Sequence, residues 1–255
     1  MPLTRSGIHY HISKGSGPAV VLIHGVTMDL TMWEAQVAEF GASWRCITVD
    51  LRGHGRSAPL APGYDTSADL LRVLDETAVG GCVLVGLSLG GYEAVSFAGQ
   101  HAERCAAVML VDAWIPGPEL GGWSPPFRVA RTAGRQAALE AWLNDPLFHV
   151  ARRQPDTLAS LRGMVERNDL RIWTERIPPR PAPQPRDLAS RITVPTQVLV
   201  GEHEIPGFRA VAEWLQTTIP GTVGHPLVVV PGAGHLPPME APAAFNRALA
   251  AFVEV

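Results

Sequence analysis

The sequence is poor in cysteine and lysine and has no long apolar run. Its cysteines, Cys46, Cys82 and Cys105, are odd in number and lack metal-type spacing, so we expect buried free thiols. Lys14 is the only lysine, a bias typical of a GC-rich genome. No run of about 18 apolar residues could span a bilayer. The formal net charge of −3 gives no basic surface for nucleic acid. Membranes and nucleic acids are therefore not expected as partners.

The remaining composition is that of an ordinary globular domain. The chain has 255 residues, of which 46% are hydrophobic and 18% are charged, enough to bury one large core. Residues 1–6 lack the apolar segment of a secretory signal, so we expect the cytoplasm. The chain is expected to be a monomer or a homodimer. No segment has the pattern of a docking motif for another protein.

Short apolar runs recur between helix-like stretches. Runs of this kind, continuous in Val, Ile and Leu rather than alternating, are typical of parallel strands buried on both faces. They predict an α/β fold with a mostly parallel, twisted central sheet and helices on both faces. A more alternating stretch at 7–12 predicts an antiparallel edge strand. The runs are Ala19–Ile23, 46–49, 82–85, 107–111, 197–200 and 227–230.

This alternation of apolar runs and helix-like stretches is absent between residues 113 and 191. No strand-like run occurs there, and helix-like stretches lie around Phe127–Leu143, 154–168 and 169–177. Prolines cluster at both ends of the region and break regular structure. The pattern predicts a core of residues 1–112 and 192–255, with residues 113–191 inserted as a helical cap.

One serine lies where an apolar run turns into a helix-like stretch. Gly86-Leu87-Ser88-Leu89-Gly90 has the form G-x-S-x-G, with the strand-like run before it. Such a turn strains the serine backbone and exposes its hydroxyl, while the glycines allow close backbone approach. The motif and its context predict a nucleophile at Ser88.

A serine hydroxyl needs a base, and the base needs a third group to orient it. His235 follows the last strong apolar run and is the predicted base. For the acid, Glu204 is favoured because it follows the run 197–200 and gives the chain order serine, acid, histidine. Asp112, at the end of the preceding run, and Glu202 remain alternatives.

Two backbone amides are predicted to form an oxyanion hole. The amide of Leu89 follows the serine at the start of a helix, and the amide of Val26 follows His24-Gly25 after the first central strand. His24 and Gly25 are expected to support this loop, His24 through hydrogen bonds rather than by moving protons.

The inserted region has more aromatic residues than a purely supporting helical layer needs. Because small-molecule pockets favour aromatic walls, we expect a small apolar or aromatic substrate there. The residues predicted to bind it are Trp114, Trp123, Phe127, Trp142, Phe148 and Trp173.

Several of these motifs together resemble the α/β-hydrolase fold superfamily. They are His24-Gly25-Val26, the segment 50–57 (DLRGHGRS), the segment 86–91 (GLSLGG) and the segment 232–235 (GAGH). The resemblance covers residues 1–112 and 192–255. It implies about eight strands with the cap after the sixth, Ser88 as nucleophile, His235 as base, and an oxyanion hole at Val26 and Leu89. Glu204 stands where many members have aspartate.

The resemblance implies hydrolysis of a small carboxylic ester or lactone, with no cofactor and no metal. The helical insertion is similar to that of enol-lactonases, acyl-homoserine lactonases and carbon–carbon bond hydrolases. Members with an aspartate nucleophile are excluded by Ser88. The alternatives are a carbon–carbon bond hydrolase, a lyase or synthase that uses the same triad, and a small-molecule receptor.

Overall fold

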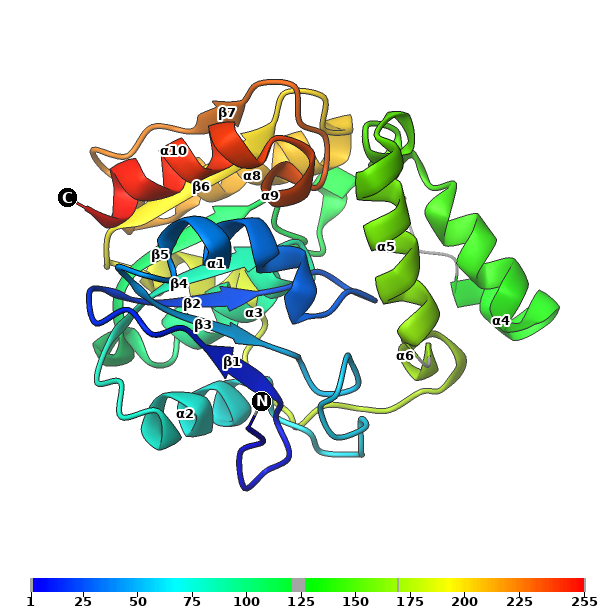
Figure 1. Ribbon diagram of the computed structural model, residues 1–255, viewed down its shortest axis with the longest axis horizontal. Helices are drawn as coiled ribbons and strands as arrows, with labels where there is room; N and C mark the ends of the chain where they lie inside the picture. Colours follow the sequence, from blue (N-terminus) through cyan, green and yellow to red (C-terminus); the bar gives the residue numbers. More distant parts are fainter. Residues whose placement is uncertain (1, 121–126, 169, 255) are drawn as a thin grey trace.

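The predicted apolar runs form one sheet. The computed structural model describes residues 2–120, 127–168 and 170–254, and in them the sheet has seven strands in the order β1-β3-β2-β4-β5-β6-β7 (Figure 1). The strands are β1 (Tyr10–Ile12), β2 (Ala19–Ile23), β3 (Arg45–Val49), β4 (Cys82–Leu87), β5 (Cys105–Val111), β6 (Thr196–Gly201) and β7 (Val228–Val230).

Strand direction follows the sequence pattern. β1 pairs with β3 in the antiparallel sense, and every other pair in the sheet is parallel. Every residue of β4 and β6 is buried, because helices cover both faces of the central strands. The predicted α/β fold with a mostly parallel sheet and an antiparallel edge is confirmed.

The sheet has one strand fewer than the expected eight in the described residues. Before β1, the chain forms only an isolated bridge between Leu3 and His9. A tight turn reverses the chain there: Gly7 has φ 82° and the amide of Thr4 bonds to the carbonyl of Ile8. The helical insertion therefore follows the fifth of the described strands, β5, rather than the sixth.

Helices cover both faces of the sheet. In Figure 1, α1 and α10 lie in contact on the near face and α3 lies on the far face, where α2 packs against it. The core helices are α1 (Glu34–Phe40), α2 (Thr66–Glu76), α3 (Leu89–Ala98), α8 (Pro206–Thr218), α9 (Pro237–Glu240) and α10 (Pro242–Val253).

The described elements between β5 and β6 are all helical. We call residues 113–191 the helical segment; its longer helices α4 and α5 stand beside the sheet, at the right of Figure 1. Gly134, with φ 83°, kinks α4. The α-helices of this segment are α4 (Phe127–Leu143), α5 (Pro155–Arg167), α6 (Arg171–Thr174) and α7 (Pro185–Leu188).

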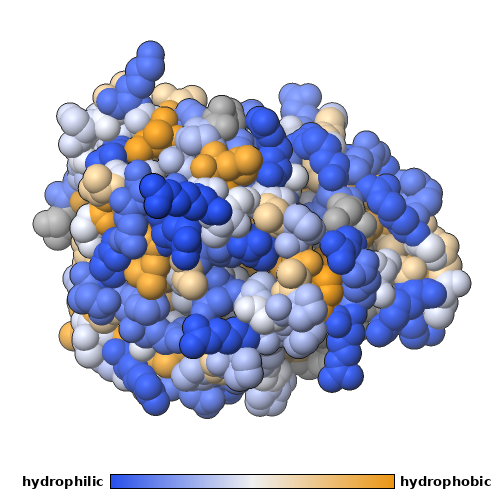
Figure 2. Space-filling view, turned by 90° about the horizontal axis from the view of Figure 1, so that it is seen from below, coloured by the Kyte–Doolittle hydropathy of each residue, from blue (hydrophilic) through white to orange (hydrophobic). Residues whose placement is uncertain are grey.

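The helix expected over 169–177 is much shorter, because only Arg171–Thr174 is helical. Leu170 enters it in the left-handed region (φ 57°) and Glu175 leaves it in extended conformation, before the proline-rich stretch. In the described residues no helix is long and apolar enough to cross a membrane. Figure 2 shows a mostly hydrophilic surface with small, separate apolar patches.

Candidate active site

Ser88 sits in a sharp turn between β4 and α3. Its φ of 53° is in the left-handed region, which is uncommon for a residue other than glycine. A Cβ atom at Gly86 would lie 2.1 Å from the carbonyl oxygen of Gly90, and one at Gly90 would lie 2.2 Å from that of Ile23. Both positions therefore require glycine, and the turn has the geometry that the motif predicts.

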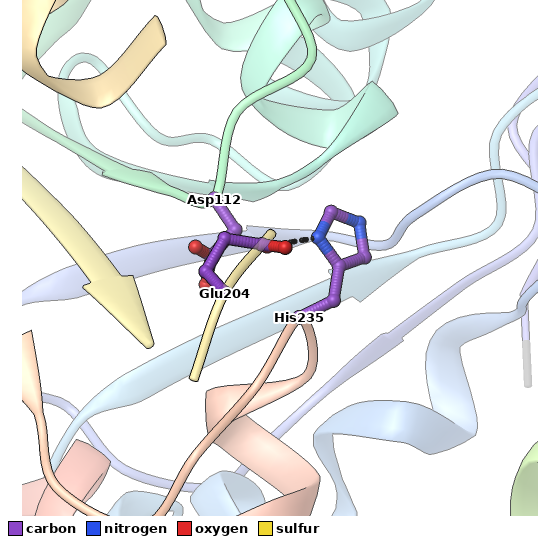
Figure 3. Close-up of side chains that lie close together, drawn as sticks. All are labelled: Asp112, Glu204 and His235. Carbon is purple, nitrogen blue, oxygen red and sulfur yellow. Dashed lines mark hydrogen bonds and ion pairs between the residues drawn. The ribbon is translucent and has the colours of Figure 1, made fainter. Parts of the chain in front are cut away.

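His235 and Glu204 meet at the carboxyl edge of the same sheet. The loop after β7 carries His235 and the loop after β6 carries Glu204, and His235 Nδ1 is hydrogen-bonded to Glu204 Oε2 (Figure 3). Both side chains are almost fully buried, at 2% and 0% exposure. The other oxygen, Glu204 Oε1, accepts from the amide of Ile205 at 2.6 Å. The carboxylate is thus fixed from two sides, and the Nε2 edge of the ring points away from it.

Asp112 lies beside this pair. It directly follows β5 with φ 40°, is fully buried, and its carboxyl oxygens are 3.2 and 3.3 Å from the amide nitrogen of Gly201. Burial, and then the neighbouring Glu204 carboxylate, raise the pKa of Asp112 well above its usual range. Two adjacent buried carboxyl groups do not both ionise readily, and a side-chain hydrogen bond with Glu204 also raises the pKa of Asp112.

The three side chains also form a possible metal donor set. One ligand atom from each of Asp112, Glu204 and His235 lies within 4.8 Å of the others. However, a ring nitrogen that is hydrogen-bonded to a carboxylate cannot bind a metal while that bond is intact. The hydrogen bond between His235 and Glu204 and the amides of Ile205 and Gly201 give these three side chains partners without an ion.

Glu202 does not reach the histidine. Its side chain is half exposed, accepts from the amide of Gly232 at 2.8 Å and lies 3.8 Å from His203 Nε2. Of the acids considered from the sequence, Glu204 contacts the His235 ring and Asp112 contacts Glu204, whereas Glu202 stabilises the start of the histidine loop.

The loop after β2 packs against the serine. A Cβ atom at Gly25 would lie 3.6 Å from Ser88 Cβ. His24 is fully buried, its Nδ1 donates to the Gly25 carbonyl at 2.7 Å, and its Nε2 accepts from the amide of Leu51 at 2.9 Å. Because Nε2 accepts from an amide it carries no proton, so the ring is neutral, and burial lowers the pKa of His24. Val26 follows Gly25 on this loop, and Leu89 is the first residue of α3.

Three of the predicted aromatic residues are buried. Trp142, Phe148 and Trp173 pack edge to face, with ring centroids 5.0 Å apart for Trp142 and Phe148 and 5.4 Å apart for Trp142 and Trp173. Phe148 in turn lies 6.5 Å from the His235 ring. This aromatic cluster therefore reaches the histidine from the helical segment.

The other aromatic residues differ in position. Trp114 is half-buried and stacks on Tyr92 at 5.4 Å, and its amide donates to the Ser88 carbonyl at 3.0 Å. Trp123 lies outside the described residues. Phe127 begins α4, and its side chain is likewise outside the description.

Two residues near the site were not found from the sequence. Glu240 Oε2 accepts from the amides of Gly234 and Leu236, at 2.6 and 3.2 Å, and so holds the backbone on both sides of His235. Thr27 follows Val26 in the left-handed region (φ 63°) and is fully buried. The only sequence signal for Glu240 is its place in a short Pro-initiated stretch after His235; Thr27 has none.

Comparisons with known proteins found similar chains. A protein of Variovorax paradoxus named "Putative carbamate hydrolase RutD" is 38% identical to this chain over 113 residues, which is 42% of each chain. A pimeloyl-[acyl-carrier protein] methyl ester esterase of Nitrosomonas europaea is 26% identical over 91% of this chain and 94% of its own. The crystal structure of the enol-lactonase from Burkholderia xenovorans LB400 superposes with a TM-score of 0.80 at 29% identity, over 97% of this chain and 96% of that one.

A family model agrees over most of the chain. It is described as the alpha/beta hydrolase family and matches residues 20–248, which include the serine turn, the helical segment and the histidine loop. The chain belongs to the alpha/beta hydrolase family.

Proposed function

We propose that this protein hydrolyses small carboxylic esters or lactones with Ser88 as nucleophile, His235 as base and Glu204 as the orienting acid. The observation that carries the proposal is the buried hydrogen bond between His235 Nδ1 and Glu204. It fixes the ring so that Nε2 keeps its lone pair and can take the proton of a serine hydroxyl, and it stabilises the imidazolium that results. Two similar proteins are named for an ester and an enol-lactone as substrates.

The reaction proceeds in two halves. Ser88 Oγ attacks the carbonyl carbon while His235 Nε2 takes the hydroxyl proton, and the amides of Val26 and Leu89 donate hydrogen bonds to the negative oxygen. The carbon–oxygen bond of the ester then breaks, and His235 returns the proton to the leaving alcohol. Water, deprotonated by His235, attacks the acyl-enzyme, and the acid and free Ser88 are released. Every step uses groups of the chain and water.

Asp112 has a separate role in this scheme. As a neutral carboxylic acid it donates to Glu204, which keeps the single negative charge of the pair on the residue that contacts His235. Glu204 is also fixed by the amide of Ile205, so its longer side chain stays in place. Asp112 is thereby a positioning residue and not the triad acid.

The helical segment supplies the cap in this proposal. Residues 113–191 cover the site, and residues 1–112 and 192–255 carry the chemistry. Trp114, whose amide bonds to the Ser88 carbonyl, and Phe148, whose ring faces His235, are placed to contact the acyl or alcohol part of a substrate. Their rings favour small apolar or aromatic groups.

A substrate panel tests the proposal. We expect Ser88-dependent release of p-nitrophenol from p-nitrophenyl acetate and butyrate, and acid release from small lactones in a pH-stat. Ser88→Ala, checked for folding by circular dichroism, is the control. Equal hydrolysis by Ser88→Ala would contradict the assignment of the nucleophile. Turnover of a 1,5-diketone without turnover of any ester or lactone would instead favour carbon–carbon bond hydrolysis.

A further inference from the structure

A buried hydrogen bond joins the helical segment to the loop that follows β2. Trp142 Nε1, on α4, donates to Thr27 Oγ1 at 2.8 Å, across 115 positions of the chain. Trp142 is 1% exposed and Thr27 is 0% exposed, so water does not compete for this bond. Thr27 is the neighbour of Val26, whose amide is assigned to the oxyanion hole.

The bond continues into the backbone of that loop. Thr27 Oγ1 accepts from the indole and donates its own proton to the carbonyl of Val26 at 2.6 Å. On the other side of Val26, the Gly25 carbonyl accepts from His24 Nδ1 at 2.7 Å and from the amide of Met28 at 3.2 Å. Because each peptide group is planar, holding the Gly25 carbonyl fixes the Val26 amide directly, whereas holding the Val26 carbonyl fixes the amide of Thr27. The Thr27 contact therefore acts on the Val26 amide by fixing the peptide that follows it.

Both peptide groups of Val26 are therefore held, but by different parts of the molecule. The Gly25–Val26 peptide is held from within the core, through His24. The Val26–Thr27 peptide is held through Thr27 by Trp142, a residue of the helical segment. Thr27 is β-branched and has φ 63°, a conformation that persists only where the surroundings enforce it.

The contact is not explained by packing alone. Trp33 is as deeply buried as Trp142, but its indole Nε1 has no hydrogen-bond partner. Trp142 is instead held edge to face between Phe148 and Trp173, an arrangement that aims its N–H at Thr27. The same Phe148 ring faces His235, so the position of Trp142 is tied to both halves of the site.

We infer that Trp142 is a positioning residue for the oxyanion hole, acting through Thr27 to fix the Val26 backbone. The inference rests on the proposed serine hydrolysis. It means that the helical segment does more than cover the substrate: when α4 is seated on the core, the loop that binds the negative oxygen is held in its active conformation. Its contribution is made in the transition state and not in substrate binding.

Two single substitutions and their combination test this inference on p-nitrophenyl acetate. Trp142→Phe removes the N–H and Thr27→Val removes the hydroxyl with nearly the same shape. We expect each to lower kcat roughly three- to tenfold, the range of one lost neutral hydrogen bond, with KM changed less than about twofold. Both substitutions break the same chain of hydrogen bonds, which runs from Trp142 through Thr27 to the Val26 carbonyl. The kcat of the double variant should therefore fall no further than that of the worse single variant.

Trp33→Phe is the matched control. It is also a fully buried tryptophan, so the same volume is lost without a hydrogen bond, and its kcat should stay within about twofold of the wild type. Should Trp142→Phe fail to fold, β-(3-benzothienyl)alanine at position 142 keeps the shape of indole and replaces only the N–H by sulfur. It should give the same kcat loss.

The outcomes separate the two claims. If Ser88→Ala is inactive and Trp142→Phe behaves like Trp33→Phe, the inference on Trp142 is wrong and the proposed function stands. Losses that multiply in the double variant, or that appear in KM alone, would also overturn the inference. If Ser88→Ala keeps the wild-type activity, the proposed function fails and the oxyanion role of Trp142 fails with it.

Discussion

The sheet core and the helical segment use their polar residues in different ways. In the core, carboxyl groups and histidines are buried at the ends of strands, as in the contact of Glu204 with His235. In the helical segment, charged residues pair across an open surface: Arg162 with Glu140 and Arg171 with Glu175 are all more than a third exposed. Exposed pairs contribute little to stability. The proposed catalytic residues therefore lie in the core, while the exposed ion pairs of the helical segment can vary at little cost in stability.

A few contacts connect the two regions. Trp142 bonds to Thr27, Arg167 pairs with Asp29 at 2.6 Å, and Gln154 Nε2 donates to the Glu240 carbonyl at 3.0 Å. The core residues in these contacts all lie near the proposed site. Thr27 and Asp29 are on the loop after β2, and Glu240 holds the loop that carries His235. Substitutions at these contacts should change activity or stability less than substitutions of the proposed catalytic residues do. They should change them more than substitutions on the exposed surface of the helical segment do.

The largest effect is expected in the core, at the nucleophile. Ser88→Ala should lower kcat by about a thousandfold or more, because the covalent step is lost. The thermal midpoint should change little, since alanine removes one oxygen without opening a large cavity. Kinetics on p-nitrophenyl butyrate and a thermal melt measure both. A loss of the same size from a substitution on the exposed face of α4 or α5 would remove the distinction between the two regions.

The next effect separates the two buried acids. Glu204→Gln should lower kcat by about a hundredfold or more, because an amide cannot stabilise the imidazolium. Asp112→Asn should lose less than about tenfold, since the amide N–H can still donate to Glu204. Steady-state kinetics of both variants decide the matter. The reverse order of losses would make Asp112 the triad acid.

The same pair predicts a dependence of stability on pH. A carboxyl whose pKa is raised by folding favours the folded state below its unfolded pKa, and this contribution is lost as pH rises through the folded pKa. Burial and Glu204 raise the pKa of Asp112. Relative to the wild type, Asp112→Asn should therefore become more stable as pH rises above about 4. Urea unfolding from pH 4 to 9 measures the trend, and a constant difference would contradict it.

A smaller effect is expected where the two regions meet. Burial alone would raise the pKa of Asp29, but hydrogen bonds from Thr31 and Arg167 outweigh it and lower that pKa. A lowered pKa stabilises the fold above the unfolded value, and this is lost as pH falls. Arg167→Gln should lower the thermal midpoint at pH 7 by a few degrees, with a smaller difference at acidic pH. Arg162→Gln, within the segment, is the control and should have less effect.

The smallest effect is expected at Glu93, a half-buried residue of α3 that accepts from Thr66 Oγ1 at 3.2 Å. Burial raises the pKa of Glu93 to about 7. Its ionisation therefore weakens the fold as pH rises through 7. Glu93→Gln should be slightly more stable than the wild type at pH 8 and about equal to it at pH 5. Thermal melts at the two pH values measure this, and an equal shift at both would contradict the account.

Local pattern predicted the core well. β2 has the expected bounds, Ala19–Ile23, and the serine turn forms where G-x-S-x-G places it. These features depend on residues that are neighbours in the chain: a buried strand needs a continuous apolar run, and a tight turn needs glycine where a side chain would clash. The edge of the sheet at β1 was less well predicted, because a turn at Gly7 decides whether the residues before β1 add another strand.

The remainder depends on contacts between distant residues. The sequence left Glu204, Asp112 and Glu202 open, since only their positions in space decide which one reaches His235. The relation of Trp142 to Thr27 likewise joins two residues with no shared motif. In the helical segment, α6 was overestimated because proline and backbone geometry end it after four residues, although its pattern continues.

The most direct test of the central claim is intact-mass analysis after treatment with a fluorophosphonate probe, which needs no known substrate. If Ser88 is activated by His235, the folded wild-type protein should gain one probe mass, and neither Ser88→Ala nor His235→Ala should gain any over the same time. Labelling of Ser88→Ala at the wild-type rate, or no adduct on folded wild-type protein, would contradict an activated serine at this turn.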